Sequence, residues 1–132
     1  MTNIDAITGS QLMRLWGVSS WIDPGANYYL WDGCCVFAMV KQSGFYDIHV
    51  AMDKRRWSEC RKAGESILKM FGHHKLRAVI ISDRPRVCNY ARRMGFGERT
   101  IQTLKTVDGR ESAFFIMWRD PGGISWAEQL KV

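Results

Sequence analysis

Apolar and polar positions in the middle of the chain follow a strand, helix, strand, helix order. The short apolar run 45–52 lies between Gly44 and Asp53 and predicts a strand. Apolar residues then recur at helical spacing up to position 71, and the β-branched run 76–81 predicts a second, buried strand. Another helical stripe follows and ends at Gly95. This order favours two parallel strands joined by a right-handed crossover.

The segment before this core predicts a helix and two strands. Residues 10–16 carry apolar side chains at helical spacing, and Ser10 is placed to cap a short helix. The apolar runs 27–31 and 34–41 are separated by Asp32-Gly33, which is a strong hairpin signal. We therefore expect these strands to pair with each other and with the strand at 45–52.

The segment after the core predicts one more hairpin. Residues 98–107 alternate loosely, residues 112–118 are strongly apolar, and Asp108-Gly109 lies between the two runs. The tail 124–132 is read as a short helix or a docked segment. The whole pattern predicts an α+β fold, with a mixed, mostly antiparallel sheet of about six strands and helices on both faces.

Composition is that of an ordinary folded protein. At 132 residues with 46% hydrophobic and 24% charged residues, we expect a single domain spanning 1–132. No run approaches the length of a membrane span, and residues 1–5 lack a basic stretch followed by an apolar one, so we expect no signal peptide. The four cysteines lack CxxC spacing, so we expect reduced, buried thiols in a cytoplasmic protein, with the adjacent Cys34 and Cys35 on opposite faces of a strand. His73-His74 has no partners at metal-ligand spacing, and we expect no metal site.

The stretch from Val79 to Phe96, VIISDRPRVCNYARRMGF, resembles the GNAT acetyltransferase superfamily. It is similar to the family's late strand, the helix after it and the Gly-Phe pair that opens the next strand. The similarity covers roughly half of the chain, and the layout also looks like that of small phage-encoded proteins with this fold. The resemblance implies a GNAT-like fold and an acetyl-CoA-dependent N-acetyltransferase acting on an amine. The alternative is a catalytically inactive GNAT-fold phage protein with a structural role, or a role in virion assembly or host interaction.

The resemblance also places a cofactor site in the turn after the first core strand. In the family, small residues there let backbone N–H groups approach the pyrophosphate of acetyl-CoA. The aligned stretch is 55–60, in which both family glycines are missing; an offset alignment beginning at Arg61 recovers one glycine but leaves too short a helix. An ordinary helix start capped by Asp53 is the other interpretation. The implied cofactor contacts are Arg55, Arg56, Ser58 and Cys60.

Two residues are candidates for proton transfer. His49, on the first core strand, could take a proton from an incoming amine. The resemblance implies a Tyr on the late helix as general acid, but that position is Ala91, and the nearest tyrosine is its neighbour Tyr90. Each residue also has a structural interpretation, as a histidine held within the sheet and as a core tyrosine.

The net charge of +6 is concentrated in the core. The segments 54–56 and 84–86 both begin predicted helices at the same sheet edge, so we expect one positive patch there. Its partner could be a phosphate-rich cofactor, nucleic acid or an acidic protein surface, and solvated helix faces remain an alternative. Six tryptophans and six phenylalanines suit either a large aromatic core or a protein-docking surface.

Overall fold

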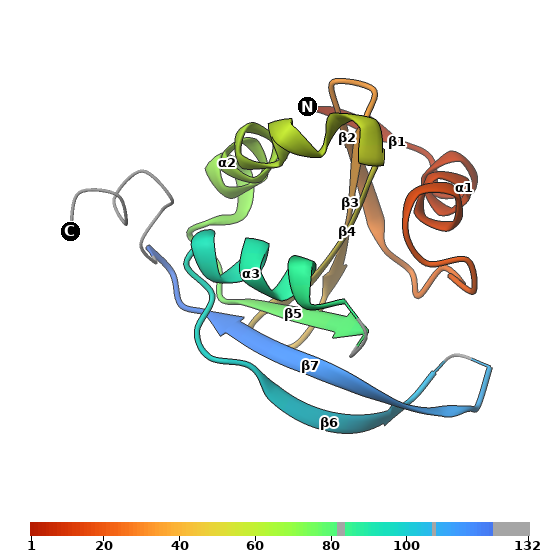
Figure 1. The fold of residues 1–132 in the computed structure, drawn as a ribbon, viewed down its shortest axis with the longest axis vertical. Coiled ribbons are helices and arrows are strands. Elements are labelled where there is room, and N and C mark those ends of the chain that lie inside the picture. The colour runs from red at the N-terminus through yellow and green to blue at the C-terminus, as the bar shows by residue number, and fades with distance from the viewer. Residues whose placement is uncertain (82–83, 107, 123–132) are drawn as a thin grey trace.

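The computed structural model describes residues 1–81, 84–106 and 108–122. Over these ranges the strands form one seven-stranded sheet in the order β1-β2-β3-β4-β5-β7-β6, and helices lie against both of its faces (Figure 1). The strands are β1 (Thr2–Ile4), β2 (Asn27–Trp31), β3 (Cys35–Lys41), β4 (Tyr46–Met52), β5 (Leu76–Ile81), β6 (Thr100–Lys105) and β7 (Glu111–Arg119). The helices are α1 (Ala6–Trp16), α2 (Cys60–Phe71) and α3 (Pro85–Arg93), and the 3-10 helix η1 (Lys54–Glu59) precedes α2.

The predicted α+β fold is confirmed, with one strand more than expected. The additional strand is β1, which pairs antiparallel with β2 in a register that sets Thr2 opposite Leu30. Three residues are too few to show an alternating pattern, so this strand could not be predicted from the sequence. The two predicted hairpins and the parallel pairing of β4 with β5 are confirmed. The predicted tail at 124–132 lies outside the described residues.

The first helix begins earlier than predicted, and its cap is a different residue. The Asp5 carboxylate accepts a hydrogen bond of 2.8 Å from the Thr8 backbone N–H and caps α1. Ser10 is buried inside the helix, where its hydroxyl lies 3.1 Å from the Tyr28 hydroxyl. The prediction that Ser10 caps the helix is therefore wrong, because Asp5 supplies the same chemistry one turn earlier.

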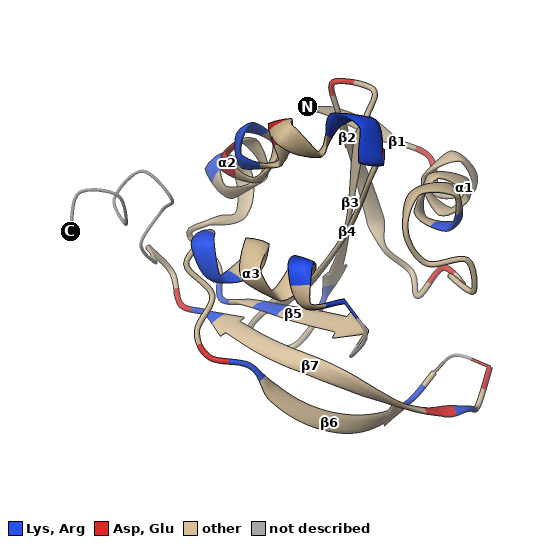
Figure 2. Ribbon diagram, in the orientation of Figure 1, with Lys and Arg blue, Asp and Glu red and all other residues tan. Residues whose placement is uncertain are grey.

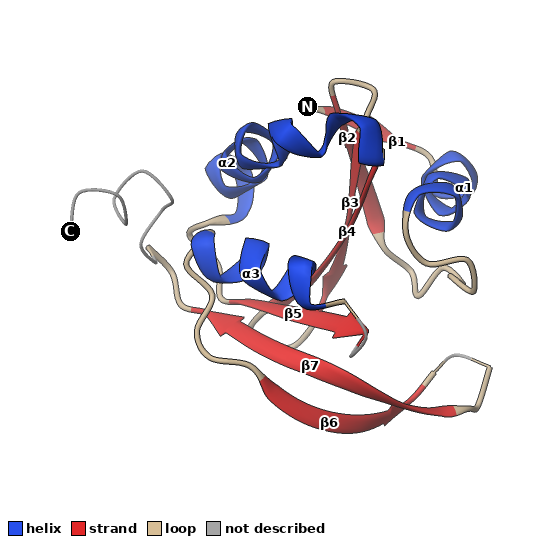
Figure 3. Ribbon diagram, viewed as in Figure 1, coloured by secondary structure: helices blue, strands red, loops and turns tan. Residues whose placement is uncertain are grey.

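The core is divided between the two faces of the sheet. Figure 3 shows α2 and α3 on one side of the β3-β4 region and α1 on the other. The α1 face buries Met13, Tyr28, Val36, Ala38 and Ala51, whereas the larger cluster on the α2/α3 face includes Cys35, Phe37, Met39, Ile67, Leu76 and Met117. Because neighbouring strand residues point to opposite faces, each of β3 and β4 contributes to both clusters.

The four cysteines are buried, but the prediction for one pair is wrong. β3 begins at Cys35, so Cys34 lies in the preceding turn and the alternation of a strand does not apply to it. Both side chains consequently pack into the cluster under α2 and α3.

Among the described helices, none combines the length and the apolar character that crossing a membrane would require.

The parallel pair β4-β5 is short, and this determines where the site forms. Pairing runs only from Tyr46 opposite Leu76 to Ile48 opposite Ala78. The buried Asp47 carboxylate joins the two strands there, accepting hydrogen bonds of 2.5 and 2.8 Å from the Arg77 guanidinium. Beyond this ion pair the second halves of the two strands separate.

Candidate functional site

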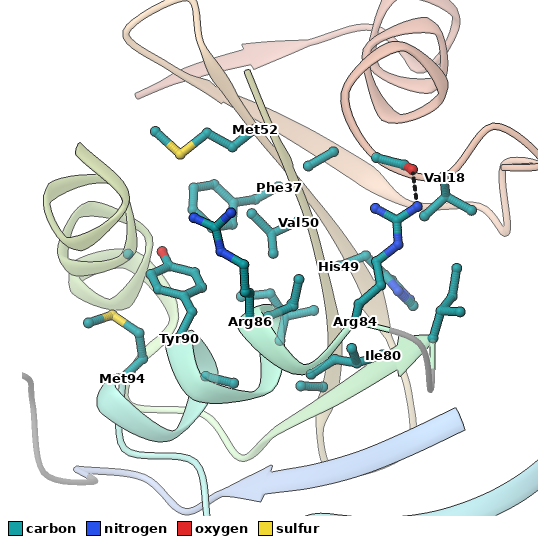
Figure 4. A pocket seen from close by; sticks show the side chains of 18 of the residues that line it. Val18, Phe37, His49, Val50, Met52, Ile80, Arg84, Arg86, Tyr90 and Met94 are labelled. Atoms are coloured by element: carbon teal, nitrogen blue, oxygen red, sulfur yellow. Dashed lines mark hydrogen bonds between the residues drawn. The ribbon is translucent and has the colours of Figure 1, made fainter. Parts of the chain in front are cut away.

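A cavity of about 590 Å³ lies where β4 and β5 separate. Residues 48–52 of β4 and residues 78–81 of β5 form its two walls. From the α1 side it is lined by Met13, Trp16, Gly17 and Val18. From the other side it is lined by Gly64 and Ile67 of α2, Val87 of α3, and Met94 directly after α3. Figure 4 shows Val18 and Met94 on these two sides. Because the lining comes from both faces of the sheet, the cavity reaches through the gap between the strands.

The charged side chains among the described lining residues of this cavity are cations. Lys54, Arg84 and Arg86 line it, and no Asp or Glu is found among its described lining residues. Figure 2 shows basic residues at η1 and at the start of α3. The predicted meeting of the segments 54–56 and 84–86 at one sheet edge is confirmed for these three side chains.

Contacts within the chain orient two of these three cations, Arg84 and Arg86. The Arg86 guanidinium lies over the Trp57 ring, 5.4 Å from its centroid, in a cation–π contact. Arg84 donates a hydrogen bond of 2.9 Å to the Gly17 carbonyl, so it links the start of α3 to the end of α1 across the cavity. Pro85 in the first turn of α3 suits a helix start and places these arginines at the end of β5.

Arg55 and Arg56, predicted to contact a cofactor, have partners within the chain. The Asp53 carboxylate accepts a 3.0 Å hydrogen bond from the Arg55 backbone N–H and a 2.9 Å hydrogen bond from its guanidinium. These hydrogen bonds lower the pKa of Asp53 below its usual range. Arg56 forms ion pairs with Asp32 and Glu59. The expectation that Asp53 caps a helix start is confirmed for η1.

Ser58 and Cys60 lie away from the cavity lining as well. Ser58 is exposed, and Cys60 is buried at the first position of α2. The residues of this segment that reach the cavity are Lys54 and Trp57. The glycine-free sequence forms a 3-10 helix in which N–H groups bond to Asp53 and to nearby carbonyls, so it differs from an open phosphate-binding loop. The four predicted cofactor contacts remain predictions.

His49 lies on the α1 face of β4 and lines the cavity. Its ring packs edge-on against Trp21, with 5.1 Å between the ring centroids. Burial lowers the pKa of His49 to about 4, with the nearby Asp47 opposing this shift and Arg77 adding to it. At neutral pH the imidazole is therefore uncharged and can accept a hydrogen bond or a proton.

The lowered pKa of His49 predicts an acid-sensitive contribution to stability. An unfolded histidine titrates near 6.5, so between pH 6.5 and about 4 the unfolded chain binds a proton that the folded chain does not. The free energy of unfolding should therefore fall over this window as the pH decreases. Relative to the His49→Asn variant, we expect the wild type to lose roughly 2 kcal/mol more between pH 7 and 4.5. Urea unfolding at both pH values measures this difference, and parallel losses in the two proteins would contradict it.

Tyr90 is held in the packing between α2 and α3. Its side chain is buried, and its hydroxyl donates a 2.8 Å hydrogen bond to the Cys60 carbonyl. Gly64 permits this approach, because a Cβ there would collide with the Tyr90 hydroxyl and the Met94 sulfur. Burial raises the pKa of Tyr90 well above its ordinary value, so the hydroxyl keeps its proton. The ring also borders the cavity beside Trp57, with 5.5 Å between centroids.

The Tyr90→Phe variant separates a structural role from a chemical one. The Cys60 carbonyl would lose its donor, so the free energy of unfolding should fall by about 1 kcal/mol. If Tyr90 also protonates a leaving group, turnover should fall by about 100-fold. The matched control is Tyr29→Phe on β2, outside the cavity lining. An unchanged rate would remove Tyr90 from the chemistry, and unchanged stability would contradict the structural role.

The α1 lining of the cavity was not predicted from the sequence. Residues 13–18 are far along the chain from β5 and α3, and the hydrogen bond from Arg84 to Gly17 spans 67 positions. Trp57 belongs to the apolar spacing that predicts a helix up to position 71, whereas the structure places it in η1 with its side chain toward the cavity. Its position directly after three basic residues was the available signal, since aromatic and basic residues next to one another often serve ligand binding.

Comparisons with known proteins identify the fold. No protein-family model matches the sequence, and a search of the curated proteins gave no match. Among solved structures, a putative acetyltransferase from the GNAT family from Bacteroides thetaiotaomicron has 12% sequence identity and a TM-score of 0.61, covering 98% of this chain and 90% of that chain. The ribosomal-protein-S18-alanine N-acetyltransferase from Escherichia coli has 14% identity and a TM-score of 0.59, with 94% of each chain covered.

A third similar structure is an acetyltransferase of the GNAT family from Streptococcus pneumoniae, with 11% identity and a TM-score of 0.54. That alignment covers 68% of this chain and 62% of the other chain. The protein therefore has a GNAT-like fold, as its sequence pattern implied. At these identities the likeness concerns the fold.

Proposed function

We propose that this protein binds acetyl-CoA in the cavity between β4 and β5 and transfers the acetyl group to an amine. The observation that carries the proposal is the cavity itself, which opens where the two parallel strands separate and is bordered by Lys54, Arg84 and Arg86. Its volume of about 590 Å³ lies within the range of sites for small molecules and cofactors. The three solved structures with a similar fold are described as acetyltransferases.

The residues present fit the parts of this cofactor. An extended, amide-containing arm suits the gap between β4 and β5, because the separated strand edges can offer backbone hydrogen bonds to it. The apolar walls formed by residues such as Val50 and Ile80 suit its alkyl segments. Lys54 and Arg86 at the start of η1 and α3 would hold its phosphates, with Arg55 and Arg56 nearby along η1. The bound thioester would supply an activated acetyl group.

His49 and Tyr90 are the proposed residues for proton transfer. The neutral His49 imidazole would accept the proton that the amine loses, directly or through a water molecule. Tyr90 keeps its proton and borders the cavity from the α3 side. Its hydroxyl must leave the Cys60 carbonyl to donate to a leaving thiolate.

A second candidate is a non-catalytic protein on the same fold, such as a phage structural, assembly or host-interaction factor. Two observations favour it: the Tyr90 hydroxyl already has a partner, and Arg55 and Arg56 are engaged in ion pairs within the chain. Such a protein would use the basic rim of the cavity, formed by Lys54, Arg84 and Arg86, to bind an acidic protein or nucleic acid. It would bind anions without releasing free CoA from acetyl-CoA.

Calorimetric titration with acetyl-CoA tests the proposal. We expect saturable binding that weakens about 10-fold in Lys54→Ala and in Arg86→Ala, because each change removes a charge-assisted contact. The matched controls are Lys62→Ala and Arg61→Ala, exposed positions on α2 outside the cavity lining. Arg55→Ala tests the site predicted from the sequence, and a larger loss of affinity there would assign the phosphates to Arg55 in place of Lys54 and Arg86.

The outcomes separate the two candidates. Absence of binding at millimolar acetyl-CoA would overturn the cofactor site. Binding without CoA release in the presence of a panel of amines would favour the non-catalytic protein. Release is best followed by chromatography, which separates free CoA from acetyl-CoA directly.

A further inference from the structure

Building on the proposed function, we infer that Trp21 is a positioning residue for the proposed base His49, and that the buried Tyr28 hydroxyl holds Trp21 in place. His49 lines the cavity from the α1 face of β4 (Figure 4), whereas Trp21 is not among the described residues that line it. The Trp21 ring instead packs edge-on against the imidazole, with 5.1 Å between the ring centroids. Trp21 therefore covers a side of His49 that does not face the cavity, and a ligand approaches the imidazole through the cavity.

Hydrogen bonds to Tyr28 fix the position of the Trp21 ring. The indole N–H donates a 3.0 Å hydrogen bond to the Tyr28 hydroxyl, which itself donates one of 2.8 Å to the Asp23 carboxylate. Because a phenol has a single proton to donate, the Ser10 hydroxyl, 3.1 Å from that of Tyr28, is the donor in the third contact. Burial raises the pKa of Tyr28, so its hydroxyl keeps this proton at neutral pH. The Tyr28 hydroxyl therefore links Trp21 to both α1 and β2.

The chain between α1 and β2, residues 17–26, is anchored along its length. The Asp23 carboxylate accepts hydrogen bonds of 3.1 and 3.0 Å from the backbone N–H groups of Gly25 and Ala26. The Arg14 guanidinium donates a 3.1 Å hydrogen bond to the Trp21 carbonyl. Gly17 lies so close to β4 that a Cβ there would come within 2.9 Å of the Ala51 Cβ. Trp21 is thus carried by a fixed segment, which suits a residue that orients another side chain.

The effect of Trp21 on His49 can be separated from that of charge. Burial is the main cause of the lowered pKa of His49, and Asp47 and Arg77 act on it in opposite directions. Charged side chains face this region from several elements: Asp47 on β4, Arg77 on β5, the cavity-lining Lys54, Arg84 and Arg86, and Arg14 and Asp23 on the α1 side. Replacing Trp21 leaves these charges in the chain and changes the burial of the imidazole. A shielded and fixed imidazole is neutral and already oriented when the amine arrives.

Nuclear magnetic resonance titration of the imidazole tests the inference without acetyl-CoA, and the His49→Asn variant identifies the resonance. In the wild type the imidazole should remain neutral down to about pH 5, whereas in Trp21→Ala its pKa should rise from about 4 toward 6.5, because water reaches the ring. Trp21→Phe keeps a ring edge beside the imidazole and should keep most of the low pKa. Tyr28→Phe removes the acceptor of the indole N–H and should give an intermediate value. The matched control is Tyr29→Phe, whose ring packs against Phe71 on the other face of the sheet.

The pH dependence of turnover connects the ring contact to the reaction. With acetyl-CoA at saturation and one amine that supports CoA release, kcat/KM is compared at pH 7.5 and pH 5.5, so that protonation of the amine itself affects every variant equally. An imidazole with a pKa near 6.5 is about 10% neutral at pH 5.5, so Trp21→Ala should lose about 10-fold more activity over this range than the wild type. Trp21→Phe and Tyr29→Phe should follow the wild type.

Each outcome decides a different part of the inference. The same His49 pKa in folded Trp21→Ala as in the wild type would overturn the shielding by Trp21. A raised pKa with an unchanged pH dependence of turnover would overturn its role in the reaction and leave Trp21 as a packing residue. If acetyl-CoA does not bind or no amine releases CoA, the proposed function fails and takes the role in the reaction with it, whereas the titration still decides whether Trp21 shields His49.

Discussion

Replacing Arg119 with Met is expected to lower the free energy of unfolding by about 3 kcal/mol. Arg119 ends β7 with only 4% of its surface exposed, yet it carries a full charge. Its guanidinium donates hydrogen bonds of 2.8 Å to the Met94 carbonyl and 3.0 Å to the Gly72 carbonyl. Both carbonyls lie at helix C-termini, those of α3 and α2, where orphan carbonyls and the helix dipole favour a cation. Methionine would fill the space and leave these carbonyls without this donor.

Two further variants make the Arg119 prediction specific. Arg119→Lys keeps the charge but not the planar fork, so we expect an intermediate loss of stability. Arg110→Met, at an exposed position before β7 where 85% of the side chain is accessible, should change stability little. Urea unfolding measures all three. A loss of less than about 0.5 kcal/mol for Arg119→Met would show that solvent or rearrangement replaces the guanidinium.

The periodic middle of the chain was predictable because its information is local. Apolar spacing located β4, α2, β5 and α3 within a few residues, and turn residues located the hairpins. The predicted start of α1 is wrong because two residues could cap the helix, and Asp5 does so instead of Ser10. The helix assigned to the segment after β4 begins only at Cys60, because the residues before it form η1.

The site was predictable only in outline, since it depends on long-range geometry. The sequence indicated that the basic segments after β4 and β5 would meet, and the cavity brings Lys54, Arg84 and Arg86 together. It could not show that β4 and β5 stop pairing after three residue pairs, because neither strand changes composition there. Nor could it show that Arg56 would pair with Asp32, 24 positions earlier in the chain.

Filling the cavity with a single side chain is expected to reduce acetyl-CoA affinity by about 100-fold or more, which corresponds to about 2.7 kcal/mol. Val50 lies on β4 in the wall of the cavity and packs only partly against the core. In Val50→Trp the indole would occupy the space between the strands in which the cofactor arm is proposed to lie. Because that space is open, the larger side chain should cost far less stability than it would in a close-packed core.

The control for Val50→Trp is Val40→Trp, a partly buried position on β3 outside the cavity lining. Thermal unfolding of both variants should show folded proteins, with the melting temperature of Val50→Trp close to that of the wild type. Calorimetry should then show acetyl-CoA binding retained in Val40→Trp and lost in Val50→Trp. If Val50→Trp is folded and still binds acetyl-CoA at the wild-type affinity, the ligand does not occupy the gap between β4 and β5. The basic rim would then serve a ligand that rests on the surface, and the salt dependence of its binding would be steep.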